Sequence, residues 1–258
     1  MSTPRLSVIL ITHNEAGHIA ACLASVAFAD EWIVVDSASS DDTAERARRL
    51  GAQVFDFADW PGFGAQKQRA LDRATGRWVL AIDADERVTP ELRDEIRGLA
   101  TRGFAHAGYR IPRLAFYLGH WIKGTDWWPD PQLRLFDRRR GRWQGGLIHE
   151  SVRVDGSVGR LRARMEHFSY DDISDHLATI DRYTTLWAEQ AQQEGRRSGP
   201  LDPAAAALWA FFRNYVVRRG LLLGEAGLTV SALNSYYTYV KLAKLRERRN
   251  GGPPPPPA

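Results

Sequence analysis

The chain has 258 residues, of which 44% are hydrophobic and 26% charged, so it is ordinary for a globular protein and long enough for a large domain with an appendage. Its single cysteine, Cys22, excludes an intrachain disulfide or a cysteine-rich metal site and is typical of a reducing compartment. The net charge of +4 favours an anionic partner. We expect no secretory signal and no spanning helix, because the apolar runs are short or interrupted by arginines.

Buried strands and amphipathic helices alternate along the first third of the chain. The expected strands cover 6–11, 31–36, 53–55 and 77–83, and the expected helices cover 16–26, 44–50 and 65–74. This order predicts an α/β fold with a mostly parallel sheet and flanking helices. Such sheets bind ligands beyond the carboxyl ends of their strands.

Polar residues gather at those strand ends. Thr12, Asn14 and Glu15 follow the first strand, Asp36 ends the second, and Asp83 and Asp85 follow the fourth. If this last segment is extended, residues two apart point to one side, so both aspartates face one site. Clustered carboxylates repel unless a cation offsets them, and divalent cations prefer oxygen ligands. The alternative is a loop of solvated acids that caps the next helix.

The sequence lacks two common nucleotide-binding motifs. Neither a Gly-x-Gly-x-x-Gly motif after the first strand nor a Gly-x-x-x-x-Gly-Lys-Ser/Thr motif occurs. This argues against a dinucleotide-dependent oxidoreductase and against a P-loop enzyme.

The pattern changes after a helix that we expect to begin near Pro90 with Thr89 as its cap. Expected strands at 108–113, 132–136 and 145–154 predict an antiparallel or mixed extension of the sheet that covers an acceptor site. Residues 116–130 between them are rich in aromatic side chains.

The C-terminal quarter predicts helices. Ser174 and Asp175 are expected to cap a helix that ends near residue 194, and two further amphipathic helices follow a linker at 195–203. The last of these is basic over 241–249, which is typical of a membrane-surface element. The alternative is a helical hairpin packed on the preceding domain. The tail at 251–258 contains five prolines and is expected to be disordered.

Three segments together resemble the family 2 inverting glycosyltransferases. They are SVILITHNE at 7–15, IVVDS at 33–37 with SDDT at 40–43, and DADE at 83–86. Later segments, RLF at 134–136 and IHE at 148–150, are similar to the subgroup that builds the lipopolysaccharide core, which includes a β-1,4-glucosyltransferase. The resemblance implies a GT-A-type, Rossmann-like fold that binds a nucleotide sugar and a divalent cation, Mg²⁺ or Mn²⁺.

The resemblance also implies roles for individual residues. The nucleotide sugar is expected to contact Thr12, Asn14, Glu15, Asp36, Lys67 and Asp83. Asp85 would ligate the metal, and His167 would complete the metal shell. Many relatives have two consecutive aspartates where this chain has Asp36 followed by Ser37, so the pocket contact there depends on Asp36 alone. For Lys67 the alternative is an exposed helix face.

Inverting transfer needs a base that takes the proton of the acceptor hydroxyl. We expect Glu150 to be that base, positioned by His149, with Asp126 and Asp130 as rivals. The acceptor is expected to contact Trp127, Trp128, Asp130 and Arg134.

These patterns predict a GT-A-like domain at 1–170, a helical basic extension at 171–250 and a tail at 251–258. The expected reaction transfers glucose from UDP-glucose to a lipopolysaccharide-core or other lipid-linked saccharide, in the cytoplasm, at the inner membrane. The expected partners are the donor, the acceptor and an anionic membrane surface that the C-terminal helices contact, and no nucleic acid. The alternatives are a nucleotidyltransferase and a non-enzymatic protein that binds nucleic acid or lipid surfaces.

Overall fold

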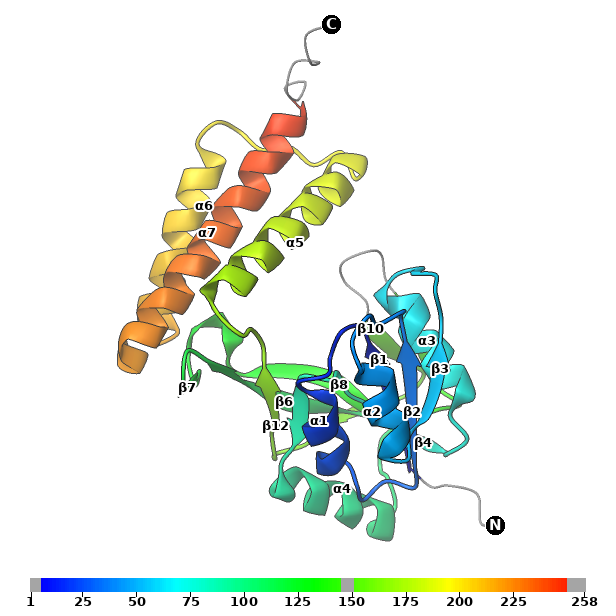
Figure 1. Cartoon of the computed structure of the whole chain (residues 1–258). Coiled ribbons are helices and arrows are strands. Elements are labelled where there is room, and N and C mark those ends of the chain that lie inside the picture. Colours follow the sequence, from blue (N-terminus) through cyan, green and yellow to red (C-terminus); the bar gives the residue numbers. More distant parts are fainter. Residues whose placement is uncertain (1–5, 145–150, 250–258) are drawn as a thin grey trace, which may run out of the picture. The chain divides into compact units, whose positions relative to one another are not determined.

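The computed structural model describes residues 6–144 and 151–249, and the chain divides into two compact units (Figure 1). The first unit comprises Met1–Leu114 and Asp130–Phe168, and the second comprises Ala115–Pro129 and Ser169–Ala258. The aromatic segment Ala115–Pro129, which the sequence analysis assigned to the first domain, therefore groups with the C-terminal helices. The tail at 251–258 lies outside the described residues.

The N-terminal half of the first unit has the predicted alternation of strands and helices. Its strands are β1 (Leu6–Thr12), β2 (Glu31–Asp36), β3 (Gln53–Asp56) and β4 (Trp78–Ala81), and its helices are α1 (Ile19–Ser25), α2 (Thr43–Arg49) and α3 (Phe63–Arg73). The strands are parallel and lie in the order β3-β2-β1-β4, with Thr12 opposite Asp36. The α/β prediction is confirmed, and the carboxyl ends of β1, β2 and β4 meet at one edge of the sheet.

The sheet continues with strands of both directions. This part contains β5 (Glu86–Val88), β6 (Gly108–Tyr117), β8 (Asp130–Asp137), β11 (Val158–Arg160) and β12 (Met165–Phe168), with α4 (Pro90–Arg102) after β5. Strand β8 runs antiparallel between β4 and β6, and β12 pairs antiparallel with β5. A separate hairpin pairs β9 (Gly141–Gln144) with β10 (Ser151–Val154). The predicted mixed extension is confirmed, and it brings β8 beside β4.

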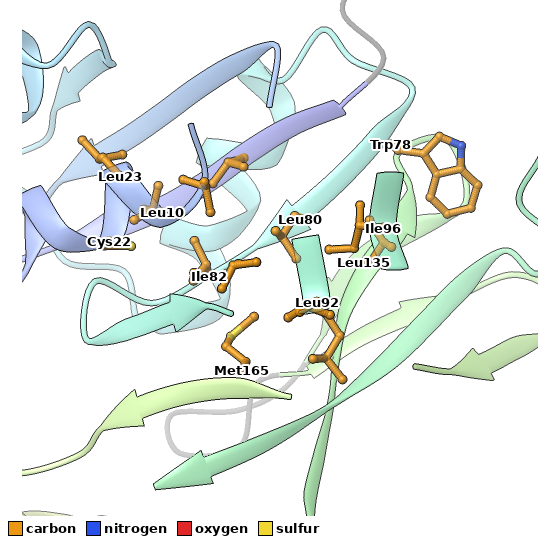
Figure 2. Packing of buried hydrophobic residues seen from close by; sticks show 14 of the residues in the cluster. Leu10, Cys22, Leu23, Trp78, Leu80, Ile82, Leu92, Ile96, Leu135 and Met165 are labelled. Atoms are coloured by element: carbon orange, nitrogen blue, oxygen red, sulfur yellow. The ribbon is translucent and has the colours of Figure 1, made fainter. Parts of the chain in front are cut away.

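Apolar side chains cover both faces of the inner parallel strands β1, β2 and β4, which explains their runs of apolar residues, whereas the edge strand β3 is exposed at Gln53 and Asp56. Figure 2 shows part of the cluster on one face, which includes Leu10, Cys22, Leu23, Leu80, Leu92 and Met165. On the other face, Ile9 and Val79 pack with Leu71 of α3. Burial raises the pKa of the Cys22 thiol, so this cysteine is a structural core residue.

The second unit is mainly helical. It contains α5 (Ile173–Gln193), α6 (Asp202–Phe212), α7 (Gly224–Arg249), the short strand β7 (His120–Trp121) and a 3-10 turn at Thr125–Trp127. Helix α7 lies between α5 and α6 (Figure 1), and a π-helical turn at Arg213–Val217 and a 3-10 turn at Gly220–Leu223 connect α6 to α7. No helix in the described part of the chain combines the length and the apolarity needed to cross a membrane.

The two predicted helix caps have different outcomes. Thr89 caps α4 as expected, because its Oγ1 accepts a 3.2 Å hydrogen bond from the backbone N–H of Leu92. The prediction that Ser174 and Asp175 cap α5 is wrong. Asp172 is the cap, and its carboxylate accepts a 2.8 Å hydrogen bond from the backbone N–H of Asp175. An N-cap must precede the helical backbone and satisfy an N–H two or three residues later, which only Asp172 does here.

Candidate functional site

The loops after β1 and β2 are joined by buried hydrogen bonds. Thr12 Oγ1 donates to Asp36 Oδ1 over 2.7 Å, and both residues are almost completely buried. The hydroxyl of Ser39 donates to Asp36 Oδ1 over 2.6 Å, and its backbone N–H donates to Asp36 Oδ2 over 2.8 Å. Both oxygens of Asp36 therefore accept hydrogen bonds within the chain, and Asp36 fixes the two loops relative to each other. Its expected contact with the base and ribose stays a prediction.

Asn14 and Glu15 shape the rim of the same region. Asn14 has a φ of 58°, a left-handed conformation that asparagine tolerates better than most residues. Its Oδ1 accepts a 2.8 Å hydrogen bond from the backbone N–H of Ser40. The backbone N–H of Glu15 donates to Thr43 Oγ1 over 2.7 Å. These bonds connect the loop after β1 to the loop that enters α2.

Helix α3 bridges the ends of β2 and β4. Gln66 is fully buried, and its Nε2 donates to Ser37 Oγ over 2.8 Å. The next residue, Lys67, is also buried, and its Nζ lies 3.0 Å from Asp83 Oδ1. Lys67 is therefore not on an exposed helix face, because its ammonium group points to the end of β4.

Asp83 lies between two cations. Besides Lys67, Arg134 from β8 donates to Asp83 Oδ2 over 2.5 Å. Burial alone would raise the pKa of this carboxyl, but Arg134 and Lys67 hold the pKa of Asp83 well below its usual range. The Asp83 side chain is still 29% exposed, so a carboxylate whose ionised form is stabilised by two cations borders the surface of the site.

Glu86 extends this pairing into the interior. It is completely buried, and its Oε1 lies 2.6 Å from Arg134 and 3.2 Å from Arg113. Arg113 also pairs with Asp130 at 2.6 Å. Burial disfavours the charged form of Arg134, but Asp83 and Glu86 outweigh it and raise the pKa of its guanidinium. We call the six residues of this arrangement the charge network: Lys67, Asp83, Glu86, Arg113, Asp130 and Arg134.

The charge network differs from the roles that the sequence suggested for its members. Asp130 and Arg134 were expected at the acceptor, whereas their charged groups contact Arg113 on one side and Asp83 and Glu86 on the other. Sequence reasoning gave no role to Glu86 and Arg113. The third carboxylate of the run at 83–86 was the available signal for Glu86.

Residues 83–86 form a turn, so the assumption of an extended segment is wrong. The backbone N–H of Glu86 donates to the carbonyl oxygen of Asp83 over 3.0 Å. The turn gives Asp83 and Asp85 different partners. Asp85 Oδ2 lies 3.1 Å from Nε2 of His167, which β12 places opposite Glu86.

Asp85 has the one feature of this region that fits a bound cation. Its Oδ1 is buried and has no hydrogen-bond partner in the described part of the chain. An unpartnered buried carboxylate oxygen is costly, and a hard divalent cation is the group that such an oxygen binds best. The described residues contain no cluster of three or more His, Cys, Asp or Glu side chains suited to a metal ion. Asp85 and His167 therefore fit a cation that takes its other ligands from a phosphate group or water.

The aromatic residues of the expected acceptor site belong to the second unit. The Trp127 ring packs against Tyr117 and Tyr170, with centroids 5.5 Å and 5.9 Å away, and its Nε1 donates to Asn234 Oδ1 over 3.2 Å. Trp127 is thus part of the packing of the helical unit. Trp128 precedes a cis peptide bond to a proline.

The expected base could not be located by its contacts, because Glu150 and His149 lie outside the described residues. Of the two rival bases, Asp130 pairs with Arg113. Asp126 pairs with Arg213 and accepts a 2.9 Å hydrogen bond from Asn214 Nδ2.

Comparison with known sequences gives consistent matches. The model of the family described as Glycosyl transferase family 2 matches residues 7–157. RP128, an uncharacterized glycosyltransferase of Rickettsia prowazekii (strain Madrid E), is 31% identical over 256 residues, which cover 94% of this chain and 87% of that protein. The lipopolysaccharide core biosynthesis glycosyltransferase LpsC of Rhizobium meliloti (strain 1021) is 28% identical over 253 residues, which cover 94% of this chain and 92% of LpsC.

A solved structure has a similar fold. The mannosyltransferase PcManGT from Pyrobaculum calidifontis, determined in complex with GDP-Man and Mn²⁺, aligns with 95% of this chain over 88% of its own. The TM-score is 0.54 and the sequence identity is 19%, so this likeness concerns the fold alone.

Proposed function

The chain belongs to glycosyltransferase family 2 and has a GT-A-type fold with a C-terminal helical extension, and on this basis we propose that it transfers glucose from UDP-glucose to a lipid-linked saccharide such as the lipopolysaccharide core. Similarity to LpsC supports the acceptor class. The complex of PcManGT with GDP-Man and Mn²⁺ supports a nucleotide-sugar donor with a divalent cation. The choice of UDP and glucose follows from the subgroup that the sequence resembles.

The observation that carries this proposal is the pair of Asp85 and His167 beside Asp83. Asp85 brings a buried carboxylate oxygen without a partner among the described residues, and His167 Nε2 lies 3.1 Å from the other oxygen. We assign to these two side chains the binding of Mg²⁺ or Mn²⁺. A cation there would neutralise charge on the diphosphate leaving group.

Asp83 is assigned to orient the donor. Lys67 and Arg134 keep it ionised, and their contacts fix the position of both of its oxygens. Each carboxylate oxygen has a second lone pair, and Asp83 is partly exposed, so it is suited to accept a hydrogen bond from a hydroxyl group of the ribose or of the transferred sugar. Glu86, which is completely buried, supports this geometry from within.

We keep Glu150 as the general base, with His149 as its positioning residue. The contacts of its two rivals support this choice. Asp130 pairs with Arg113, and Asp126 pairs with Arg213, so both rivals are already engaged in ion pairs within the chain.

We further propose that the reaction takes place at the cytoplasmic face of the inner membrane. A single buried cysteine and a lipid-linked acceptor are consistent with that location. Trp128 is retained as a candidate contact to the acceptor sugar.

The test is metal-dependent turnover of nucleotide sugars. Purified protein is incubated with a panel of UDP- and GDP-sugars in the presence of Mn²⁺, Mg²⁺ or EDTA, and released nucleotide is measured. We expect turnover of UDP-glucose that needs metal and that Asp85→Ala abolishes. The matched control is Asp94→Ala, which removes a carboxylate that is 64% exposed on α4 and leaves the site intact. If no nucleotide sugar binds or turns over under any metal condition, the proposal is wrong.

A further inference from the structure

The outer face of α6 and of the turns that follow it exposes large apolar side chains. We call this set the α6 face: Leu208, Trp209, Phe212, Val216, Val217 and Leu222, which are 74%, 58%, 48%, 44%, 56% and 70% exposed. Leu208, Phe212 and Val216 follow one another at a spacing of four residues, so they form one stripe along the helix. Large apolar patches are uncommon on the surface of a soluble protein and usually mark a binding surface.

The orientation of α6 is the reverse of the usual amphipathic arrangement. The helix turns its small and polar side inward, where Ala210 and Asn214 are buried. Ser235 of α7 donates to the carbonyl oxygen of Ala207 over 2.8 Å, and Asn234 donates to Asn214 over 3.0 Å. A helix that serves only the interior of its domain buries its large apolar residues instead. These hydrogen bonds to α7 therefore hold α6 with its apolar side outward.

Cationic residues lie along α6 and the turns that follow it. Residues 202–225 contain three arginines, Arg213, Arg218 and Arg219, and one acidic residue at each end, Asp202 and Glu225. Asp126 pairs with Arg213, while Arg218 is 53% exposed and lies 3.8 Å from the same carboxylate. Arg219 is exposed as well. This segment therefore combines exposed apolar side chains with two exposed arginines, Arg218 and Arg219, which favours a partner that is both apolar and anionic.

We propose that the α6 face docks on a membrane that contains anionic lipids. The apolar side chains would insert at the boundary between headgroups and acyl chains, and Arg218 and Arg219 would contact the phosphates. A second copy of the chain fits less well, because a two-fold contact would bring the same arginines together. This inference rests on the proposed function in one respect, which is that a lipid-linked acceptor lies in a membrane. The docking itself involves neither donor nor metal.

The basic end of α7, where the sequence suggested membrane contact, is less suited to it. Lys244 pairs with Asp181 at 2.6 Å, and Arg248 pairs with Glu189 at 2.5 Å. Lys241 lies over the ring of Trp187, 5.2 Å from its centroid. These three cations are engaged within the helical unit, whereas Arg219 is exposed and forms no ion pair with the described residues, so we assign the main contact to the α6 face.

The experiment is flotation of the full chain with vesicles, either of phosphatidylcholine alone or of phosphatidylcholine mixed with phosphatidylglycerol. We expect stronger binding to the mixed vesicles, by about fivefold for each contacting arginine. The double variant Trp209→Ser/Leu222→Ser should lower the partition coefficient by about tenfold or more. The matched control is Leu177→Ser on α5, which removes an apolar side chain that is 40% exposed in the same unit and should leave binding unchanged.

Arg219→Glu provides a second variant that keeps the apolar residues. It should lower binding to the mixed vesicles and leave binding to phosphatidylcholine unchanged. The inference is overturned if the wild-type chain binds neither vesicle, or if Trp209→Ser/Leu222→Ser binds as the wild type does. It is also overturned if the chain is a dimer that this double variant converts to a monomer, which would identify a second copy as the occupant. Donor turnover without vesicles, measured in parallel, reports on the proposed function separately.

Discussion

Replacing Arg134 with methionine tests the charge network most directly. Arg134 is 6% exposed and is the only residue of the charge network that contacts both Asp83 and Glu86, at 2.5 Å and 2.6 Å. Methionine keeps a chain of similar length but leaves the two carboxylates without their shared cation. Removing one partner of a buried ion pair costs about 3–5 kcal/mol, because the remaining charge stays buried. At about 2–4 °C per kcal/mol for a chain of this size, the melting temperature should fall by roughly 6–20 °C.

The pH dependence of this loss has a definite sign. In the wild type the folded-state pKa of Asp83 lies below its value in the unfolded chain. Such a carboxylate stabilises the fold above its unfolded pKa of about 4, and this stabilisation is lost as the pH falls further. The variant lacks the contribution of Arg134 at every pH. The difference in melting temperature between the wild type and Arg134→Met should therefore be largest near neutral pH and should decrease below about pH 4.

Melting is followed by circular dichroism from neutral pH to pH 3, with Arg77→Met as the control. Arg77 pairs with Asp137 at 3.2 Å; Asp137 is itself buried, but the Arg77 side chain is 65% exposed, so solvent screens this pair and its loss should cost less than the loss of Arg134. Both variants lose one arginine, but Arg134→Met removes a buried cation from two carboxylates, whereas Arg77→Met removes an exposed cation from one. The reasoning is refuted if Arg134→Met costs no more than Arg77→Met, or if the wild type and Arg134→Met diverge as the pH falls.

Two further predictions concern the second unit. Gly227→Ala should destabilise the fold by about 1–3 kcal/mol or more in thermal melts, because the added Cβ would collide with the carbonyl oxygen of Gly220. The control is Gly17→Ala, whose Cβ would meet nothing within 4 Å. Equal melting temperatures of the two variants would contradict the prediction. His176 is 3% exposed and its Nδ1 lies 3.1 Å from the hydroxyl of Tyr117; burial lowers the pKa of His176 to about 4. Because this histidine binds a proton near pH 6.5 in the unfolded chain, the melting temperature should decrease as the pH is lowered from about 6.5 to about 4. His176→Phe should flatten this part of the plot of melting temperature against pH. An unchanged slope would exclude His176 as its cause.

The parallel half of the sheet was predictable because its signals are local. The strands β1, β2 and β4 each contain a run of four apolar residues, each helix has its own periodicity, and the parallel order of such units follows from the alternation. By the same logic, the sequence alone predicts that the ends of β1, β2 and β4 lie together. Thr12 and Asp36 are 24 residues apart in sequence, yet their hydrogen bond follows from the pairing of consecutive parallel strands.

The charge network was not predictable in the same way. Arg134 lies 51 residues from Asp83, and Arg113 lies 27 residues from Glu86. Their contacts depend on β8 inserting antiparallel between β4 and β6, and no local pattern specifies that order. The turn at 83–86 was not predictable either, because an Asp-x-Asp spacing alone does not distinguish a strand from a turn.

The α6 face shows a different limit of sequence reasoning. Helical periodicity predicts one broad apolar stripe made of Leu208, Phe211, Phe212, Tyr215 and Val216, of which Leu208, Phe212 and Val216 are exposed in the structure. Periodicity does not say which side of a helix faces its neighbours. The side of α6 that faces α7 is set by the hydrogen bond between Asn214, in the π-helical turn after α6, and Asn234 on α7. These residues are 20 apart in sequence, and their hydrogen bond forms only in the folded unit.

The charge balance of the network bears on how a nucleotide sugar would be held. Lys67, Arg113 and Arg134 face Asp83, Glu86 and Asp130, so these three cations are matched by three carboxylates and leave no surplus positive charge for a diphosphate. Under the proposed function, a cation at Asp85 and His167 would supply positive charge that the network itself does not. Donor and metal would then strengthen each other's binding by the same factor, because such coupling is reciprocal. The internal pairing of the network is thus a physical argument, separate from the resemblance, for testing whether donor binding needs a metal.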